Sequence, residues 1–323
     1  MLFLRLSAVG LLLVTALSAQ SLQLEQTIPL PKADGRIDHL SLDAAGGRLF
    51  VAALGHNSVE VVDLKAGRVL RSLSGFSEPQ GLYYVAESNR LYVANGGTGA
   101  IDVLDGSSFA RLATIKCGDD ADNVRYDAAA QQLYVGYGSG ALGIVDTAKN
   151  TLLGSIPLGS HPESFQLEPD GSRIFVNVPG SHTIAVVDRT ARKVVTNWSL
   201  GLVAANFPLA LDAAHHRAFV ACRVPARLLV FDTESGRELA KLDLHGDCDD
   251  VFFDAKRQQI YASCGDGFID VFTQTDPDHY TRKETLKTPA KARTSLFDGE
   301  HLYLAAPRAG GEDARILIYH FPP

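Results

Sequence analysis

The sequence predicts an all-β protein, a seven-bladed β-propeller of four-stranded antiparallel blades closed by an N-terminal strand that completes the C-terminal blade. Three observations predict this fold. Seven similar segments follow one another at a nearly constant period, and each is rich in β-branched and aromatic residues between Gly, Asn and Asp turns. The last segment also lacks one strand, which the first residues of the fold can supply.

The first 19 residues differ from the rest of the chain, and we expect the propeller to occupy residues 20–323. Residues 1–5 carry one positive charge, residues 6–17 are apolar, and Ser18-Ala19 adds small residues. This is the pattern of a secretory signal peptide, and the apolar run is too short for a bilayer span. We therefore expect cleavage near Ala19 and an exported protein, periplasmic or secreted, with no membrane span.

Each repeat begins with a short apolar strand, continues with a strand reading aromatic-Val-Ala or similar, and has a third strand ending in Val-Asp. The clearest copies pair residues 91–95 with 101–105 and residues 174–177 with 184–188. One position in each first strand marks the repeat: Leu40, Leu82, Val124, Phe165, Leu209, Val251 and Ser295. The steps between these anchors are 42, 42, 41, 44, 42 and 44 residues, a spacing typical of propeller blades.

The two ends of the chain complement each other. The seventh repeat ends after residues 315–320, its third strand, and has no fourth. Residues 22–30 precede the first anchor at the offset of the outer strands 68–73 and 152–158. The N-terminal strand is therefore predicted to complete the last blade, which closes the ring and protects its seam.

Residues 162–188 resemble the YVTN β-propeller repeat. They read Glu-Pro-Asp-Gly at 168–171, Ile-Phe-Val-Asn at 174–177 and Ile-Ala-Val-Val-Asp at 184–188. Repeats five and six differ from the family pattern, with Ala221-Cys222 and Ser263-Cys264 in place of Thr-Asn. The resemblance covers nearly the whole mature chain and implies a propeller. It leaves function open, because the family includes surface-layer proteins, lactonase-like enzymes and accessory subunits of quinoprotein dehydrogenases.

Residues just before the seven anchors are expected to converge at one mouth of the central channel, because each innermost strand starts there. The predicted ligand-binding residues are Asp38, His39, Gln80, Asp122, Asn123, Glu163, Asn206, Asp249, Asp250 and Arg293. Four positions before their anchors lie Glu78, Asp120, His161 and Asp247. Arg293 is either an anchor for a ligand carboxylate or a structural partner of Asp38 or Asp249.

Crowded carboxylates repel one another unless they take up protons or a cation neutralises them. Oxygen ligands of this kind suit a divalent cation such as Ca²⁺ or Mg²⁺, and adding His39 or His161 would suit Zn²⁺ or Mn²⁺. Similarity to lactonase-like propellers implies a metal held by Asp122, Glu163, Asn206 and Asp249. The alternative is a wet channel mouth whose polar residues serve no specific ligand.

The chain has four cysteines, Cys117, Cys222, Cys248 and Cys264. A hairpin centred on Lys256 places Cys248 opposite Cys264, so a disulfide between them is predicted for an exported protein. Cys222 is the rival partner of Cys248, and buried free thiols or a metal cluster with His245 and Asp247 are further alternatives.

The composition excludes some classes of function. Loss of Arg5 with the signal segment takes the formal charge from −7 to −8, so nucleic acid is not an expected partner. The sequence contains no phosphate-binding glycine loop, His-Glu-x-x-His motif, Gly-x-Ser-x-Gly motif or haem-attachment motif. We expect a non-enzymatic scaffold that binds a small polar ligand or a protein partner. The alternatives are a metal-dependent lactonase-like hydrolase and an accessory subunit of a periplasmic quinoprotein dehydrogenase.

Overall fold

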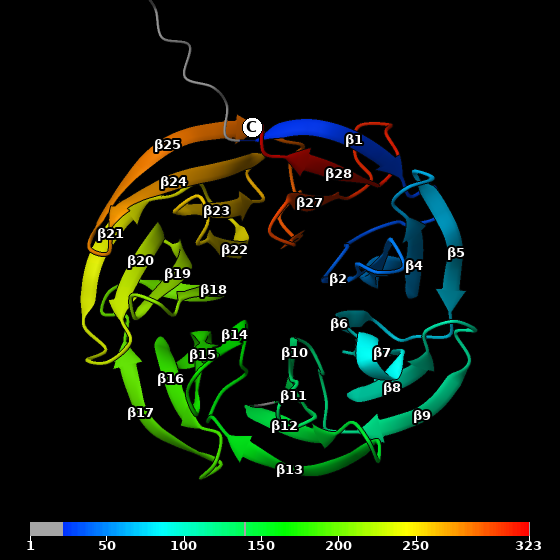
Figure 1. Ribbon diagram of the computed structural model, residues 1–323, viewed down its shortest axis with the longest axis horizontal. Coiled ribbons are helices and arrows are strands. Elements are labelled where there is room, and N and C mark those ends of the chain that lie inside the picture. Colours follow the sequence, from blue (N-terminus) through cyan, green and yellow to red (C-terminus); the bar gives the residue numbers. More distant parts are fainter. Residues whose placement is uncertain (1–21, 139, 323) are drawn as a thin grey trace, which may run out of the picture.

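Seven four-stranded antiparallel sheets surround a central axis, as the ring of blades in Figure 1 shows. The computed structural model describes residues 22–138 and 140–322, and the predicted signal peptide lies outside these residues. The predicted seven-bladed β-propeller is confirmed. None of the described residues belongs to a helix long and apolar enough to cross a bilayer.

In every blade the strands follow one another from the axis outward. The innermost strands contain all seven predicted anchors; they are β2 (Leu40–Asp43), β6 (Pro79–Val85), β10 (Val124–Asp127), β14 (Phe165–Leu167), β18 (Ala204–Asp212), β22 (Cys248–Asp254) and β26 (Ser295–Phe297). The second strands are β3 (Arg48–Ala53), β7 (Arg90–Asn95), β11 (Gln132–Tyr137), β15 (Arg173–Val178), β19 (Arg217–Val224), β23 (Gln259–Cys264) and β27 (His301–Ala306).

The third and fourth strands complete each blade. The third strands are β4 (Ser58–Asp63), β8 (Ala100–Asp105), β12 (Ala141–Asp146), β16 (Thr183–Asp188), β20 (Ala226–Asp232), β24 (Phe268–Asp276) and β28 (Arg315–His320). The outer strands are β5 (Arg68–Ser74), β9 (Arg111–Lys116), β13 (Thr151–Pro157), β17 (Lys193–Ser199), β21 (Glu238–Asp243), β25 (His279–Lys287) and β1 (Gln23–Pro29). Short 3-10 turns η1 (Leu54–His56), η2 (Ala86–Ser88) and η3 (Pro179–Ser181) lie between strands.

The ring closes as the sequence predicts. Strand β1 pairs with β28 in the order β1-β28-β27-β26, with Ile28 opposite Ile316 and Gln23 opposite His320. In Figure 1 the blue β1 lies outside the red β28, so the N-terminal strand is the outer edge of the last blade. Because both termini of the fold share one sheet, opening the ring requires breaking a strand pair.

Apolar side chains fill the spaces between neighbouring blades. Seven clusters of buried residues each join two adjacent blades, and the one at the closure contains Ile28, Leu49 and Ile316. These three side chains are fully buried. Both faces of each sheet, which are rich in β-branched and aromatic residues, are therefore buried against the neighbouring blades. Polar residues lie at the central channel.

The Asp that ends each of several third strands shapes the turn that follows. Asp188 Oδ1 accepts hydrogen bonds from the backbone N–H groups of Thr190 (2.8 Å) and Ala191 (2.9 Å). Asp146 makes the same pair of bonds to residues 148 and 149. The repeated Val-Asp is therefore a turn signal that directs the chain from the third strand to the fourth.

Candidate functional site

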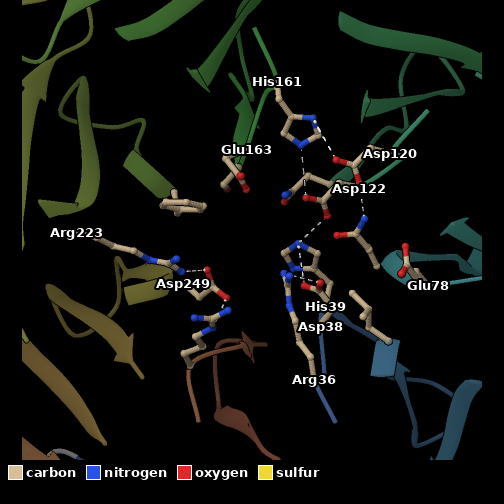
Figure 2. A pocket seen from close by; sticks show the side chains of 16 residues that line it. Arg36, Asp38, His39, Glu78, Asp120, Asp122, His161, Glu163, Arg223 and Asp249 are labelled. Carbon is tan, nitrogen blue, oxygen red and sulfur yellow. Dashed lines mark hydrogen bonds and ion pairs between the residues drawn. The ribbon is translucent and has the colours of Figure 1, made fainter. Parts of the chain in front are cut away.

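A cavity of about 360 Å³ opens where the loops before the innermost strands meet (Figure 2). The chain positions these loops with left-handed backbone four residues before several anchors, at Glu78, Asp120, Ala205, Asp247 and Lys291. Predicted ligand-binding residues that line the cavity are Asp38, His39, Gln80, Asp122, Asn123, Glu163, Asp249 and Arg293. The sequence rule of a fixed offset from the anchor therefore brings together residues from six blades.

Three side chains, Asp38 and His39 of the first blade and Asp122 of the third, form the floor of this cavity. His39 Nε2 lies 3.6 Å from Asp122 Oδ1 and 3.8 Å from Asp38 Oδ1. Burial alone would lower the pKa of His39, but the Asp122 and Asp38 carboxylates outweigh burial and raise it to about 9. Burial raises the pKa of Asp38 to about 6, although His39 and Arg36 act in the opposite direction. The floor thus holds a charged imidazolium between two carboxyl groups.

A second histidine contacts Asp122 from the other side (Figure 2). His161 Nε2 lies 4.0 Å from Asp122 Oδ2, and its Nδ1 lies 2.8 Å from the carbonyl of Gly138. The interaction with Asp122 outweighs burial and raises the pKa of His161 to about 9. Burial favours the protonated form of Asp122, but His161 and His39 hold its pKa well below the usual range. Asp122 is therefore the fixed negative charge of the floor.

Glu163 stands beside this group in the opposite protonation state. Burial and the negative charge of Asp122 raise the pKa of Glu163 to about 8, and His161 only partly counteracts them. At neutral pH the Glu163 carboxyl is mainly protonated and can donate a hydrogen bond into the cavity. The site therefore offers a donor next to strong acceptors.

Arginines on the opposite wall bind two further carboxylates. Arg223 donates to Asp249 and to the carbonyl of Cys248 (3.1 Å), and its guanidinium lies 3.8 Å from the centre of the Phe207 ring. Arg293 donates to Asp247 at 2.5 Å, and its Nε lies 3.0 Å from Asp249 Oδ2. Arg293 is thus a structural partner of Asp249, which was one of its two predicted roles.

Several acceptor atoms at the floor lack hydrogen-bond donors. In the described part of the chain, the buried oxygens Asp122 Oδ1 and Asn123 Oδ1 accept no hydrogen bond. Asp38 Oδ2 also accepts none, although Arg36 Nη2 forms an ion pair with it at 2.8 Å. Buried acceptors without donors are costly, and a ligand that brings donors or positive charge would satisfy them.

Two predicted residues do not line this cavity. Asn206 is fully buried in β18, where its Nδ2 donates to Asn177 Oδ1 and the Thr183 carbonyl, both at 3.0 Å. Asp250 faces a second cavity, and its Oδ2 accepts a hydrogen bond from the Ser295 backbone at 2.7 Å. Asn206 stands three positions before Leu209, so the offset rule does not select it, and Asp250 follows a register shift in β22.

Three of the four predicted metal ligands, Asp122, Glu163 and Asp249, line the cavity. Asn206 lies away from the cavity, and both arginines already neutralise Asp249. The described residues that could share an ion are instead Asp38, His39 and Asp122, whose ligand atoms lie within 4.8 Å of one another.

The cysteines are free thiols in the structure. Cys248 is directly opposite Cys264 in the β22–β23 pair, as the hairpin analysis predicts, but no bond joins them. Each thiol instead approaches a carbonyl of its own strand, Asp250 O at 3.6 Å and Ala262 O at 3.7 Å. The two cysteines thus lie opposite each other as buried thiols, and a disulfide between them stays a prediction.

Sequence reasoning missed two arginines of the site. Arg36 stands four positions before Leu40, the offset that located Asp120 and His161, so the same rule could have found it. Arg223 lies near the end of a second strand and not before an anchor, so the offset rule does not select it. The structure buries most of it against Phe207 and Asp249, where β19 extends toward the axis.

Comparison with known proteins supports the fold alone. A scan of protein families and a search of curated proteins found no match. A solved structure of hydrazine synthase from Kuenenia stuttgartiensis has a TM-score of 0.74 at 18% identity, covering 86% of this chain and 93% of that chain. A chain in a crystal structure of the mitotic checkpoint complex has a TM-score of 0.81 at 14% identity, covering 100% of this chain and 99% of that one. The protein shares the seven-bladed propeller architecture with both.

Proposed function

We propose that this propeller binds a small polar ligand at the cavity mouth, and that it does so outside the cytoplasm as a YVTN-type propeller. The observation that carries the proposal is the group of buried oxygens on Asp38, Asp122 and Asn123 that accept no hydrogen bond from the described residues. They face a cavity lined by polar groups from all seven blades. A rigid frame that holds unsatisfied acceptors in place is preorganised for a ligand that carries donors.

The charges of the cavity specify the ligand further. Asp122 remains ionised at neutral pH, while Arg223 and Arg293 are engaged by Asp247 and Asp249. The groups left for a ligand are therefore acceptors at the floor and the protonated Glu163 beside them. This pattern favours an amine, a polyol or a hydrated cation over an anionic molecule.

A metal-dependent hydrolase of the lactonase type is a second candidate, because Asp38, His39 and Asp122 could each supply one ligand atom to an ion. Two carboxylates with an imidazole suit Zn²⁺ or Mn²⁺ better than Ca²⁺ or Mg²⁺. His39 would have to lose its proton to coordinate, so binding would strengthen as the pH rises. When bound, such an ion would polarise a substrate carbonyl.

One experiment tests both candidates. The purified protein is analysed for metal, dialysed against EDTA, and screened by thermal shift against Ca²⁺, Mg²⁺, Mn²⁺, Zn²⁺, small amines and polyols. We expect a ligand at about 100 times its Kd to raise Tm by roughly 5–10 °C. Asp122→Asn should remove at least half of this rise, because it removes the fixed charge of the floor.

Glu87→Gln is the matched control, since it makes the same charge change on the exposed turn η2. Its ligand-induced shift should equal that of the parent protein. A flat response to every compound would overturn the binding proposal. Metal-dependent lactone cleavage, abolished by EDTA and by Asp122→Asn, would favour the hydrolase instead.

A further inference from the structure

A second cavity, of about 430 Å³, lies farther along the channel. The two cavities share His39, so this side chain lies between them. The innermost strands run from the first cavity into the second, whose lining includes residues at and after the anchors, such as Leu42 and Tyr84. The proposed function does not use this second space.

The walls of the second cavity are largely apolar and aromatic. Tyr83, Phe252 and Phe297 line it, and each keeps part of its surface accessible. Leucines of β2 and β6 also line it. A cavity of this size and character suits a small ligand with an apolar or aromatic body.

Arg125 brings a positive charge into this apolar space. Its Nη1 donates to the Val124 carbonyl (2.8 Å), and its Nη2 is 3.4 Å from Ser164 Oγ. Its guanidinium also lies 5.6 Å from the centre of the Phe165 ring. Among the described residues no carboxylate lies within ion-pair distance of Arg125. A guanidinium has five N–H donors, so several stay available for a ligand.

The neighbours of Arg125 do not replace a counter-ion. Of the acidic groups that act electrostatically on Arg125, Asp250 has a larger effect than Asp122, but Asp250 already accepts the Ser295 N–H. Burial raises the pKa of Asp250 to about 7, which weakens it as a counter-charge. Tyr83 interacts electrostatically with Arg125, and its hydroxyl has no hydrogen-bond partner within the described ranges. Arg125 and Tyr83 therefore offer two donors without a matching acceptor.

We propose that the second cavity binds a small monocarboxylate with an aromatic or apolar body, whose carboxylate pairs with Arg125 and accepts a hydrogen bond from Tyr83. The planar guanidinium matches a carboxylate in a two-bond arrangement. The rings of Phe252 and Phe297 hold the apolar part. Asp250 and Asp298 also line the cavity and disfavour a doubly charged anion such as a phosphate ester.

Isothermal titration with the full mature chain at pH 7.5 tests this assignment. The probes are benzoate, phenylacetate and 3-phenylpropionate, each compared with its neutral amide. We expect at least one acid to bind at least tenfold more tightly than its amide. Arg125→Gln should weaken binding of that acid at least tenfold and weaken binding of its amide much less, because the amide has no charge to pair with the guanidinium.

Two further variants keep the result interpretable. Arg68→Gln makes the same change on the exposed outer strand β5 and should bind the acid as the parent does. Tyr83→Phe removes one hydroxyl and should weaken acid binding severalfold, so it serves if Arg125→Gln does not fold. Equal affinity for acids and amides, no binding of any probe at millimolar concentration, or full acid binding by both cavity variants would overturn the proposal.

Discussion

Individual side chains in the first cavity have strongly different protonation preferences although they lie close together. Asp122 is stabilised as an anion by His39 and His161, whereas Glu163 has no comparable partner and experiences burial and the charge of Asp122. Similar acids thus acquire opposite states from their surroundings. The difference matters for function, because one group accepts hydrogen bonds while the other donates.

The raised pKa of Glu163 predicts a pH-dependent stability. The unfolded-state pKa is near 4.5 and the folded-state pKa is about 8, so the folded state holds more protons across this range. The contribution of Glu163 to the free energy of unfolding is therefore full below pH 4.5 and is lost as the pH rises through 8. Glu163→Gln cannot ionise, so its Tm relative to the parent should increase between pH 5 and pH 8.5.

We expect this relative change to be about 3 °C or more, which corresponds to on the order of 1 kcal/mol for a protein of this size. Thermal unfolding in metal-free buffer at several pH values measures it. The exposed Glu87→Gln should show a constant difference from the parent over the same range. A constant difference for Glu163→Gln as well would show that the Glu163 carboxyl ionises as it does in water.

At the scale of the element, the repeated turns determine where each blade presents its polar residues. The Asp at the end of β16 holds its turn through two backbone hydrogen bonds, and left-handed residues before several innermost strands direct their loops to the axis. Short polar side chains and left-handed backbone are local features that a sequence can encode directly. This is why the strand boundaries follow the repeat so closely.

Asp188→Ala should lower the free energy of unfolding by about 1 kcal/mol, because two backbone N–H groups lose their acceptor. Denaturation in urea measures the change. Asp188→Asn keeps an acceptor oxygen at the same place and should retain most of the stability. An Asn variant as unstable as the Ala variant would mean that charge, and not turn hydrogen bonding, explains the Asp at this position.

At the scale of the whole molecule, the ring itself assembles the site. The fold could be predicted completely, because period, strand composition and the missing outer strand all appear in the sequence. The cavity could be predicted in large part, since a fixed offset from the anchors selects Asp38, Asp122 and Glu163. The rule fails for Asp250, which follows a register shift in β22, and it does not select Asn206, which stands three positions before its anchor.

The role of Arg223 could not be predicted, because it depends on three-dimensional contacts and not on position in the repeat. Arg223 reaches the site from the end of β19 and packs on Phe207. Because Arg223 pairs with Asp249, the cavity that the sequence predicts to be acidic contains both positive and negative side chains. A count of the acidic residues that the sequence places at the first cavity therefore overestimates how strongly this cavity attracts cations.

The convergence of blades one and three at the cavity floor is the claim on which the site depends, and the pKa of His39 reports it directly. Nuclear magnetic resonance titration, with His39→Gln to assign the signal, measures this value. We predict a pKa of about 9 in the parent protein, because Asp122 and Asp38 lie beside the imidazole. Asp122→Asn should lower it by at least about one unit. A His39 pKa near 6.5 in both proteins would contradict the assembled floor.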